Sequence, residues 1–149
     1  MGGSVPKQFL ALGGEPLVVH SLRVLQHSPV IHEIILAVPE ADLDYCLTDL
    51  AVRYGFSKIT RVVAGGKERQ DSVRHALEHV PVETDIVVVH DAVRPFLTLD
   101  MVAHVVEAAR RVGGAIVALP MRDTVKQVGN NHHIERTVDR GPLWLAQTP

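Results

Sequence analysis

The sequence of 149 residues contains one cysteine, Cys46, and no apolar run near the roughly 20 residues of a membrane-spanning helix. A single cysteine excludes a disulfide within the chain, and a reducing, cytoplasmic setting is the default for such a protein. The chain does not open with a signal-peptide pattern, and it contains no internal repeat. The sequence therefore predicts neither a disulfide-stabilised scaffold nor a membrane protein.

The sequence also lacks an excess of charge of one sign. Its 15 Lys and Arg against 17 Asp and Glu give a net charge of −2, so neither nucleic acid nor an anionic membrane is expected as a partner. The length and the 46% of hydrophobic residues are sufficient for one globular domain with a proper core.

Several motifs that would assign a chemistry are missing. No Walker A motif and no Gly-x-Gly-x-x-Gly fingerprint occur. His75 and His79 are four residues apart, but they lack the glutamate of a His-Glu-x-x-His zinc motif. Cys46 has no motif partner, so the sequence favours neither structural zinc nor a catalytic thiol.

What the chain does contain is an alternation of apolar strands and helices of ten to fourteen residues. This alternation predicts βαβ units, a parallel sheet and an α/β fold in which the loops after the strands lie on one rim. The expected strands cover residues 31–38, 59–63, 86–89 and 114–119, and the expected helices cover residues 15–26, 41–54, 69–80 and 99–111, the last with Thr98 as its N-cap.

A predicted hairpin interrupts this alternation at about residues 122–138. Residues 123–128 and 132–138 have strand patterns on either side of a Gly-Asn-Asn turn. A two-stranded ribbon is marginally stable in water, so we expect this β-arm to protrude and to pack against another subunit.

The segment Ile86–Val89 is the centre of the predicted sheet. Four β-branched residues without polar alternation are typical of a strand covered on both faces. Ligands of open α/β sheets bind beyond the carboxyl ends of strands, where Asp91 could hold Mg²⁺ and Arg94 could bind phosphate. The alternative is that Asp91 caps a turn before Pro95 and pairs with Arg94.

Two further loops could bind phosphate or a nucleoside. Lys7 follows a glycine-containing loop whose amides could hold phosphate oxygens, although a lone lysine in such a loop is more often a solvated residue. Gly65-Gly66 joins a strand to a helix start, where Arg69, Asp71 and Ser72 could contact a base or a ribose. The alternative is a simple turn with helix-capping residues.

Six blocks of sequence, taken together, carry a family resemblance: residues 6–10, 65–73, 89–95, 123–126, 137–140 and 143–149. In this order and spacing they resemble the 2-C-methyl-D-erythritol 4-phosphate cytidylyltransferases of the non-mevalonate isoprenoid pathway. The resemblance implies a Rossmann-like nucleotidyltransferase sheet, with helices on both faces and a protruding β-arm that forms a homodimer. It also implies the formation of CDP-methylerythritol and pyrophosphate from CTP and methylerythritol phosphate.

The resemblance further implies a role for particular residues. Lys7 stabilises charge on the α-phosphate, Asp91 helps to hold the cofactor Mg²⁺, and Arg140 of one subunit binds phosphate in the site of the other. The implied cytidine contacts are Gly65, Gly66, Ser72, Asp91 and Ala92, and the implied methylerythritol phosphate contacts are Arg94, Thr124, Arg140 and Thr148.

Three alternatives remain open. The ribitol-5-phosphate cytidylyltransferases share Pro-Lys-Gln-Phe and His-Asp-Ala-Val-Arg-Pro, although residues 123–126 and 143–144 favour methylerythritol. A non-catalytic nucleotide-binding or dimerisation module is a second alternative, and a fusion to another pathway enzyme is a third.

The family pattern also contains a glycine loop with an arginine before residue 1 and a metal-binding aspartate and a lysine after residue 149. We therefore expect these 149 residues, treated as one domain that is incomplete at both ends, to lack part of the active site. Little or no turnover of CTP and methylerythritol phosphate is the expected result for this chain alone, and full activity would contradict it.

Overall fold

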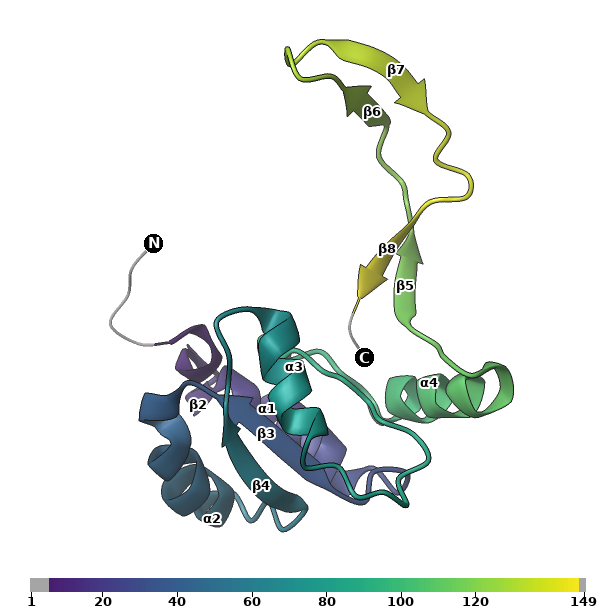
Figure 1. Ribbon diagram of the computed structural model, residues 1–149. Helices are drawn as coiled ribbons and strands as arrows, with labels where there is room; N and C mark the ends of the chain where they lie inside the picture. Colours follow the sequence, from purple (N-terminus) through teal and green to yellow (C-terminus); the bar gives the residue numbers. More distant parts are fainter. Residues whose placement is uncertain (1–5, 148–149) are drawn as a thin grey trace. The chain divides into compact units, whose positions relative to one another are not determined.

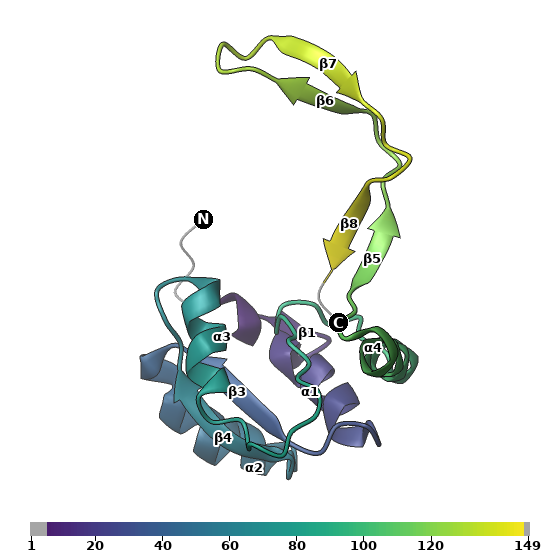
Figure 2. The same ribbon diagram turned by 45° about the vertical axis from the view of Figure 1, so that its right-hand side comes forward.

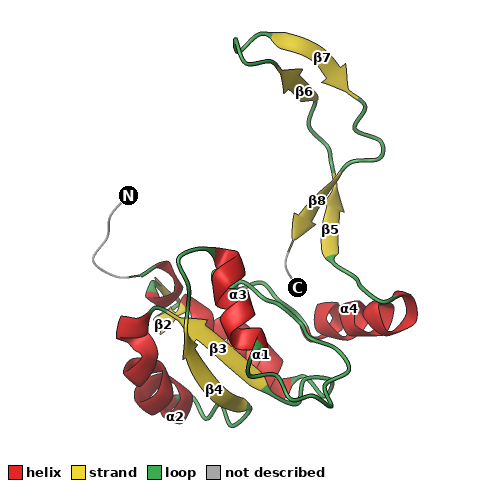
Figure 3. Cartoon of the chain, viewed as in Figure 1, coloured by secondary structure: helices red, strands yellow, loops and turns green. Residues whose placement is uncertain are grey.

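The computed structural model describes residues 6–147, which divide into two compact units on either side of residue 116. The first unit, drawn from purple to green in Figure 1, contains the helices and four short strands. The second unit, from green to yellow, consists in its described part of strands and loops (Figure 3). Each unit is described by itself.

The elements of the first unit are η1 (Lys7–Phe9), β1 (Ala11–Leu12), β2 (Glu15–Pro16), α1 (Leu17–His27), β3 (Ile34–Val38), η2 (Glu40–Asp42), η3 (Tyr45–Leu50), α2 (Ala51–Arg53), β4 (Ile59–Ala64), α3 (Arg69–Leu77) and α4 (Leu99–Val112). Those of the second unit are β5 (Val117–Pro120), β6 (Val125–Val128), β7 (Ile134–Val138) and β8 (Trp144–Gln147).

The start of α1 and both ends of α4 are explained by neighbouring residues in the sequence. Pro16 is extended and immediately precedes α1, which fits a residue that lacks an amide hydrogen. Thr98 Oγ1 accepts a hydrogen bond from the amide of Met101 at 3.2 Å, which confirms the predicted N-cap of α4. Gly113 ends α4 in the left-handed conformation, with φ of 89°, which glycine adopts without a steric penalty.

Strands β3 and β4 form the parallel pair on which the first unit is built (Figure 2). Alternate residues of β3 are buried, and they pack in one apolar cluster with the inner face of α1 and with Cys46, Leu50 and Phe56. Burial raises the pKa of the Cys46 thiol to about 11, so the thiol is neutral at pH 7 and unsuited to nucleophilic chemistry.

The fold class is mixed α/β, as predicted, but the strands of the described residues pair two by two and do not form one continuous sheet. The prediction of a buried strand at 86–89 is wrong for this structure: Val87 is 46% exposed, and none of these residues belongs to a strand. The β-branched composition favours an extended backbone, but a strand also needs a neighbouring edge to pair with. Within the described residues, no backbone hydrogen bond joins 86–89 to β3 or to another strand.

The segment predicted as a helix at 41–54 is helical from residue 40 to residue 53, but it is not one regular α-helix. The structure divides this region into η2, the π-helical η3 and the single turn α2. Cys46 and Leu50 are the buried residues of η3, so the wider π-helical turn coincides with the part of the segment that enters the apolar cluster.

The second unit contains two antiparallel pairs. β6 pairs with β7 from Val125 opposite Val138 to Val128 opposite Ile134, which confirms the predicted hairpin, and β5 pairs with β8. Ile134 and Trp144 are 64% and 60% exposed. None of the helices described in residues 6–147 is long and apolar enough to cross a membrane.

Hydrogen exchange tests whether β3 pairs with β4 along one edge and has no partner strand along the other. Ile34 donates to the carbonyl of Lys58 and Val38 accepts from the amide of Gly65, both at 2.7 Å, so the backbone groups of alternate residues face β4. We expect the amide of Leu36 to exchange about tenfold more slowly than those of Ile35 and Ala37, which face the opposite edge. Equal protection of all three amides in NMR-detected exchange would contradict this pairing.

Candidate functional site

The glycine pair at the end of β4 forms a tight loop that leads into α3. The amide of Gly66 donates to Ser72 Oγ at 3.0 Å, and the Ser72 hydroxyl donates to the carbonyl of Glu68 at 3.4 Å. A Cβ built on Gly66 would collide with the Cβ of Asp71, so only glycine fits at this position. The loop therefore presents bare backbone next to the start of a helix.

Asp71 and Ser72 thus hold the loop in shape. The carboxylate of Asp71 accepts a hydrogen bond from the amide of Glu68 at 3.1 Å, as in a helix capping box. The helix-capping alternative of the sequence analysis is therefore confirmed for Asp71, whereas Ser72 bonds to the loop at Gly66 and Glu68. The oxygen of Ser72 can accept a second hydrogen bond, so its structural role does not prevent contact with a ligand.

Asp91 connects this loop to the segment 90–95. Its Oδ1 lies 2.9 Å from Nε of Arg69 at the start of α3, and its Oδ2 lies 3.5 Å from Nε of Arg94. The amide of Arg94 donates to the carbonyl of Asp91 at 3.0 Å, so Asp91 also begins a turn. The predicted pairing of Asp91 with Arg94 is confirmed, and the pairing with Arg69 is an addition that spans 22 residues.

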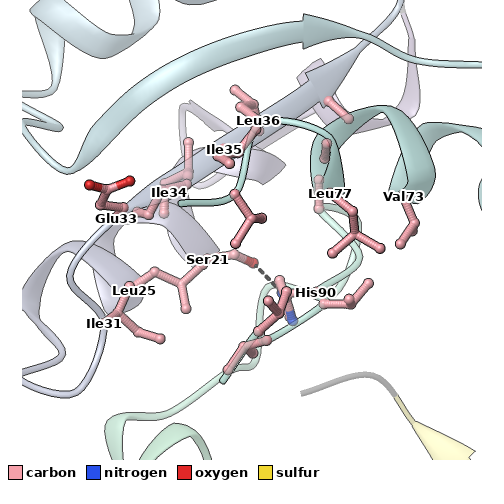
Figure 4. A pocket seen from close by; sticks show the side chains of 18 of the residues that line it. Ser21, Leu25, Ile31, Glu33, Ile34, Ile35, Leu36, Val73, Leu77 and His90 are labelled. Carbon is pink, nitrogen blue, oxygen red and sulfur yellow. Dashed lines mark hydrogen bonds between the residues drawn. The ribbon is translucent and has the colours of Figure 1, made fainter. Parts of the chain in front are cut away.

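A cavity of about 840 Å³ adjoins these residues in the first unit. Its lining includes Arg69, Ser72 and Asp91 at one end and the apolar residues of β3, α3 and segment 86–90 elsewhere. Figure 4 shows the apolar part, with Ile35 and Leu36 of β3, Val73 and Leu77 of α3, and Ser21 hydrogen-bonded to His90. This combination of an apolar wall and a few convergent polar groups is typical of small-molecule sites.

Lys7 lies in η1 and is exposed. The next two residues, Gln8 and Phe9, line the same cavity as Arg69 and Asp91. Phe9 and Ala92 both pack against the apolar cluster of α1 and β3. The structure therefore brings the segment of Lys7 to the cavity that Asp91 lines, although no interaction of the Lys7 side chain is described.

The remaining predicted residues lie in the second unit or beyond the described residues. Thr124 is exposed and immediately precedes β6, and Arg140 donates from Nη1 to the carbonyl of Arg122. Both lie near the base of the β6–β7 hairpin, where Val125 pairs with Val138. Thr148 falls outside the described residues.

The donor set for a metal is small. In the described part of the chain, no three His, Cys, Asp or Glu side chains lie together as they would around a metal ion. Mg²⁺ commonly takes one or two carboxylates and completes its octahedron with substrate phosphates and water. Asp91, with 28% of its side chain exposed, fits that requirement, in competition with the guanidinium groups of Arg69 and Arg94.

Sequence reasoning missed Ser21, and it did not assign a role to His90. Burial lowers the pKa of His90, so its imidazole is neutral at pH 7, and its Nε2 lies 3.0 Å from Ser21 Oγ. One signal was present: Ser21 is a polar residue on the apolar face of α1, between Val18 and Leu22. A buried hydroxyl at such a position needs a hydrogen-bond partner.

Comparisons with known proteins place the chain in one family. The family described as IspD, 2-C-methyl-D-erythritol 4-phosphate cytidylyltransferase, matches residues 1–149. A protein of that name from Syntrophus aciditrophicus is 48% identical over the whole chain, and a bifunctional enzyme IspD/IspF from Desulforudis audaxviator is 41% identical. The chain covers 64% of the first relative and 38% of the second.

Solved structures show the same likeness in three dimensions. The 4-diphosphocytidyl-2C-methyl-D-erythritol synthase of Anaerococcus prevotii aligns with 99% of this chain and 64% of its own, with a TM-score of 0.87 and 27% identity. The 2-C-methyl-D-erythritol 4-phosphate cytidylyltransferase of Thermus thermophilus aligns with 97% of this chain and 63% of its own, with a TM-score of 0.76 and 33% identity.

The α/β fold that carries the glycine loop and the charged turn is the fold of these solved cytidylyltransferase structures. The chain belongs to the 2-C-methyl-D-erythritol 4-phosphate cytidylyltransferase family. It spans a little under two thirds of the length of the first relative above.

Substitution of Gly66 tests the glycine loop. We expect Gly66→Ala to lower the free energy of unfolding by about 1–3 kcal/mol, because the new methyl group displaces Asp71 and the cap of α3. Gly114→Ala is the matched control, since a Cβ at Gly114 meets no atom within 4 Å. Urea denaturation of both variants measures the difference, and equal stability of the two would contradict the collision.

Proposed function

We propose that the protein transfers the cytidylyl group of CTP to 2-C-methyl-D-erythritol 4-phosphate and releases pyrophosphate. The observation that supports this most is the family match across residues 1–149, because it includes the glycine loop, the charged turn and the arm. The cytoplasm is the compartment that we propose, since Cys46 is a buried free thiol.

The reaction requires little covalent chemistry from the protein. A phosphate oxygen of methylerythritol phosphate attacks the α-phosphorus of CTP in line, and the bond from that phosphorus to the bridging oxygen of the β-phosphate breaks. The attacking group is already an anion, so no side chain needs to remove a proton. The obstacle is repulsion between two phosphates, which positive charge and fixed positioning reduce.

The first unit supplies the nucleotide site in this proposal. Gly65 and Gly66 allow the cytidine to approach the backbone, Ser72 offers a free acceptor position and Ala92 lines the pocket beside Asp91. Lys7 stabilises the charge on the α-phosphate, since a lysine reaches phosphate oxygens as a mobile point charge. The close packing around Gly66 supports this assignment, because it keeps the loop backbone uncovered.

Asp91 would hold Mg²⁺, which when bound would supply positive charge against the charge of the phosphates. Arg69 and Arg94 pair with the carboxylate of Asp91 and orient it before the nucleotide binds. Arg94 is 44% exposed at its side chain and can exchange this contact for the substrate phosphate.

The second unit would complete the polyol phosphate site and form the homodimer. Thr124, Thr148 and Arg140 are the proposed contacts with methylerythritol phosphate, with Arg140 acting in the site of the partner subunit. The two-stranded β6–β7 ribbon exposes Ile134, and the β5–β8 pair exposes Trp144, so both pairs would gain stability by packing against a second copy. The hydrogen bond from Arg140 to the carbonyl of Arg122 holds the arginine at the base of the hairpin.

Turnover by the full-length protein that its gene encodes tests the proposal. With CTP and Mg²⁺, we expect pyrophosphate release with methylerythritol phosphate and at least tenfold less with ribitol 5-phosphate, the substrate of the nearest alternative. Arg94→Ala should lower kcat/KM by about a hundredfold or more, because it removes charge at the reacting phosphates.

Arg74→Ala is the matched control for Arg94→Ala, since Arg74 is an exposed arginine on α3 that pairs with Glu78. It should leave kcat/KM unchanged. Faster turnover of ribitol 5-phosphate would contradict the assigned substrate. If neither substrate reacts, calorimetry with CTP and Mg²⁺ distinguishes a nucleotide-binding module, which releases heat, from a dimerisation module, which does not.

A further inference from the structure

Ser21 of α1 is a buried polar residue whose hydrogen bonds leave its own helix. Its side chain is 2% exposed, and a serine in mid-helix ordinarily bonds to the carbonyl four residues earlier. Here the hydroxyl lies 3.1 Å from the carbonyl oxygen of Arg94 and 3.0 Å from Nε2 of His90. These partners are 73 and 69 residues away in the sequence.

The chemistry of the hydroxyl fixes the direction of both hydrogen bonds. A carbonyl oxygen can only accept, so the one hydrogen of Ser21 goes to Arg94, and the oxygen then accepts from His90. His90 therefore carries its hydrogen on Nε2. This tautomer avoids a buried N–H group without an acceptor, because Nδ1 is buried and has no hydrogen-bond partner among the described residues.

The two hydrogen bonds of Ser21 attach both ends of the charged turn to α1. Segment 90–94 is attached to α1 at its first residue through the imidazole and at its last residue through the carbonyl. Asp91 and Arg94, the charged groups of the candidate site, lie within this segment (Figure 4 shows the Ser21–His90 bond). The amide of Arg94 also donates to the carbonyl of Asp91 at 3.0 Å, which closes the turn.

The ion pairs of Asp91 are less suited to fixing the turn. The side chains of Arg69 and Arg94 are 59% and 44% exposed, and exposed ion pairs contribute little in water. The Ser21 side chain, in contrast, is buried between Val18 and Leu22 of the apolar cluster, where an unmade hydrogen bond is unfavourable. Segment 86–90 also lacks strand pairing in the described residues, so no ladder holds the approach to the turn.

We propose that Ser21 and His90 are positioning residues, which hold the Asp91–Arg94 turn against α1 so that both charged groups face the reacting phosphates. The proposal rests on the proposed function, because it assigns the turn to phosphate chemistry. The proposal assigns neither Ser21 nor His90 a contact with the substrate. Their effect on the reaction is exerted through the backbone of the turn.

Ser21→Ala tests the proposal in the full-length protein, with Ser28→Ala as the matched control. Ser28 follows α1, is 1% exposed and has an Oγ without a hydrogen-bond partner among the described residues. The control therefore removes an equally buried hydroxyl that does not contact the turn. Thermal unfolding of both variants measures whether each of them is folded.

Two measurements separate positioning from general stability. In NMR-detected hydrogen exchange, Ser21→Ala should accelerate exchange of the Arg94 amide about tenfold, and Ser28→Ala should not. In the cytidylyl-transfer assay, Ser21→Ala should lower kcat by about tenfold to a hundredfold, with KM for CTP changed by less than about threefold, because misplacement of charge affects the transition state most.

Further variants keep the test decisive if Ser21→Ala folds poorly. His90→Phe keeps a ring but removes the Nε2 hydrogen, so it should accelerate exchange at Arg94 by a smaller factor than Ser21→Ala. Ser21→Thr keeps the hydroxyl and should restore slow exchange.

The outcomes of the two measurements are distinguishable. Equal exchange at Arg94 in the Ser21→Ala and Ser28→Ala proteins would overturn the attachment of the turn to α1. Faster exchange with unchanged kcat would overturn the positioning role. If the wild-type protein turns over neither polyol phosphate, the proposed function fails while the exchange comparison still decides the attachment.

Discussion

The packing of α1 against β3 is the contact on which the rest of the first unit depends. Val18, Val19 and Leu22 of α1 are almost completely buried among the alternate inward residues of β3. Burial of apolar side chains on this scale is the main favourable contribution to folding. The same helix face carries Ser21, so the contact that forms the core also brings a polar group to the turn at residues 90–94.

The candidate site lies where this core ends. β3 and β4 run in parallel, and the amide of Gly65 extends their ladder by one hydrogen bond to Val38. The chain then leaves the sheet through Gly66, whose backbone stays uncovered because a side chain would collide with Asp71. Arg69 follows within one helical turn and pairs with Asp91, so the glycine loop and the charged turn form one connected surface.

The electrostatics of this surface suit the transfer of a phosphoryl-type group. One carboxylate lies between two guanidinium groups, so the cluster has net positive charge before any ligand binds. In the proposed reaction, the exposed guanidinium groups of Arg69 and Arg94 would exchange their contact with Asp91 for phosphate oxygens. Neighbouring groups of opposite charge thus organise the site without a nucleophilic side chain.

The sequence alone determined the elements whose causes are local. Thr98 and Gly113 define the ends of α4, a continuous apolar run defines β3, and the Gly-Asn-Asn turn defines the β6–β7 hairpin. The motif residues also identified the glycine loop and the turn at Asp91 as candidate sites. Local propensity and short-range hydrogen bonds are sufficient for these features, and both can be read from neighbouring residues.

Only the tertiary structure decided the features that depend on distant partners. Residues 86–89 have the composition of a buried strand, yet no strand edge in the described residues pairs with them. The pairing of Arg69 with Asp91 and the two bonds of Ser21 join residues that are 22, 69 and 73 positions apart. Strand pairing and buried hydrogen bonds form between surfaces that the fold brings together. The sequence of one segment therefore indicates that it can form a strand or a buried hydrogen bond, but it does not identify the distant residues that pair with it.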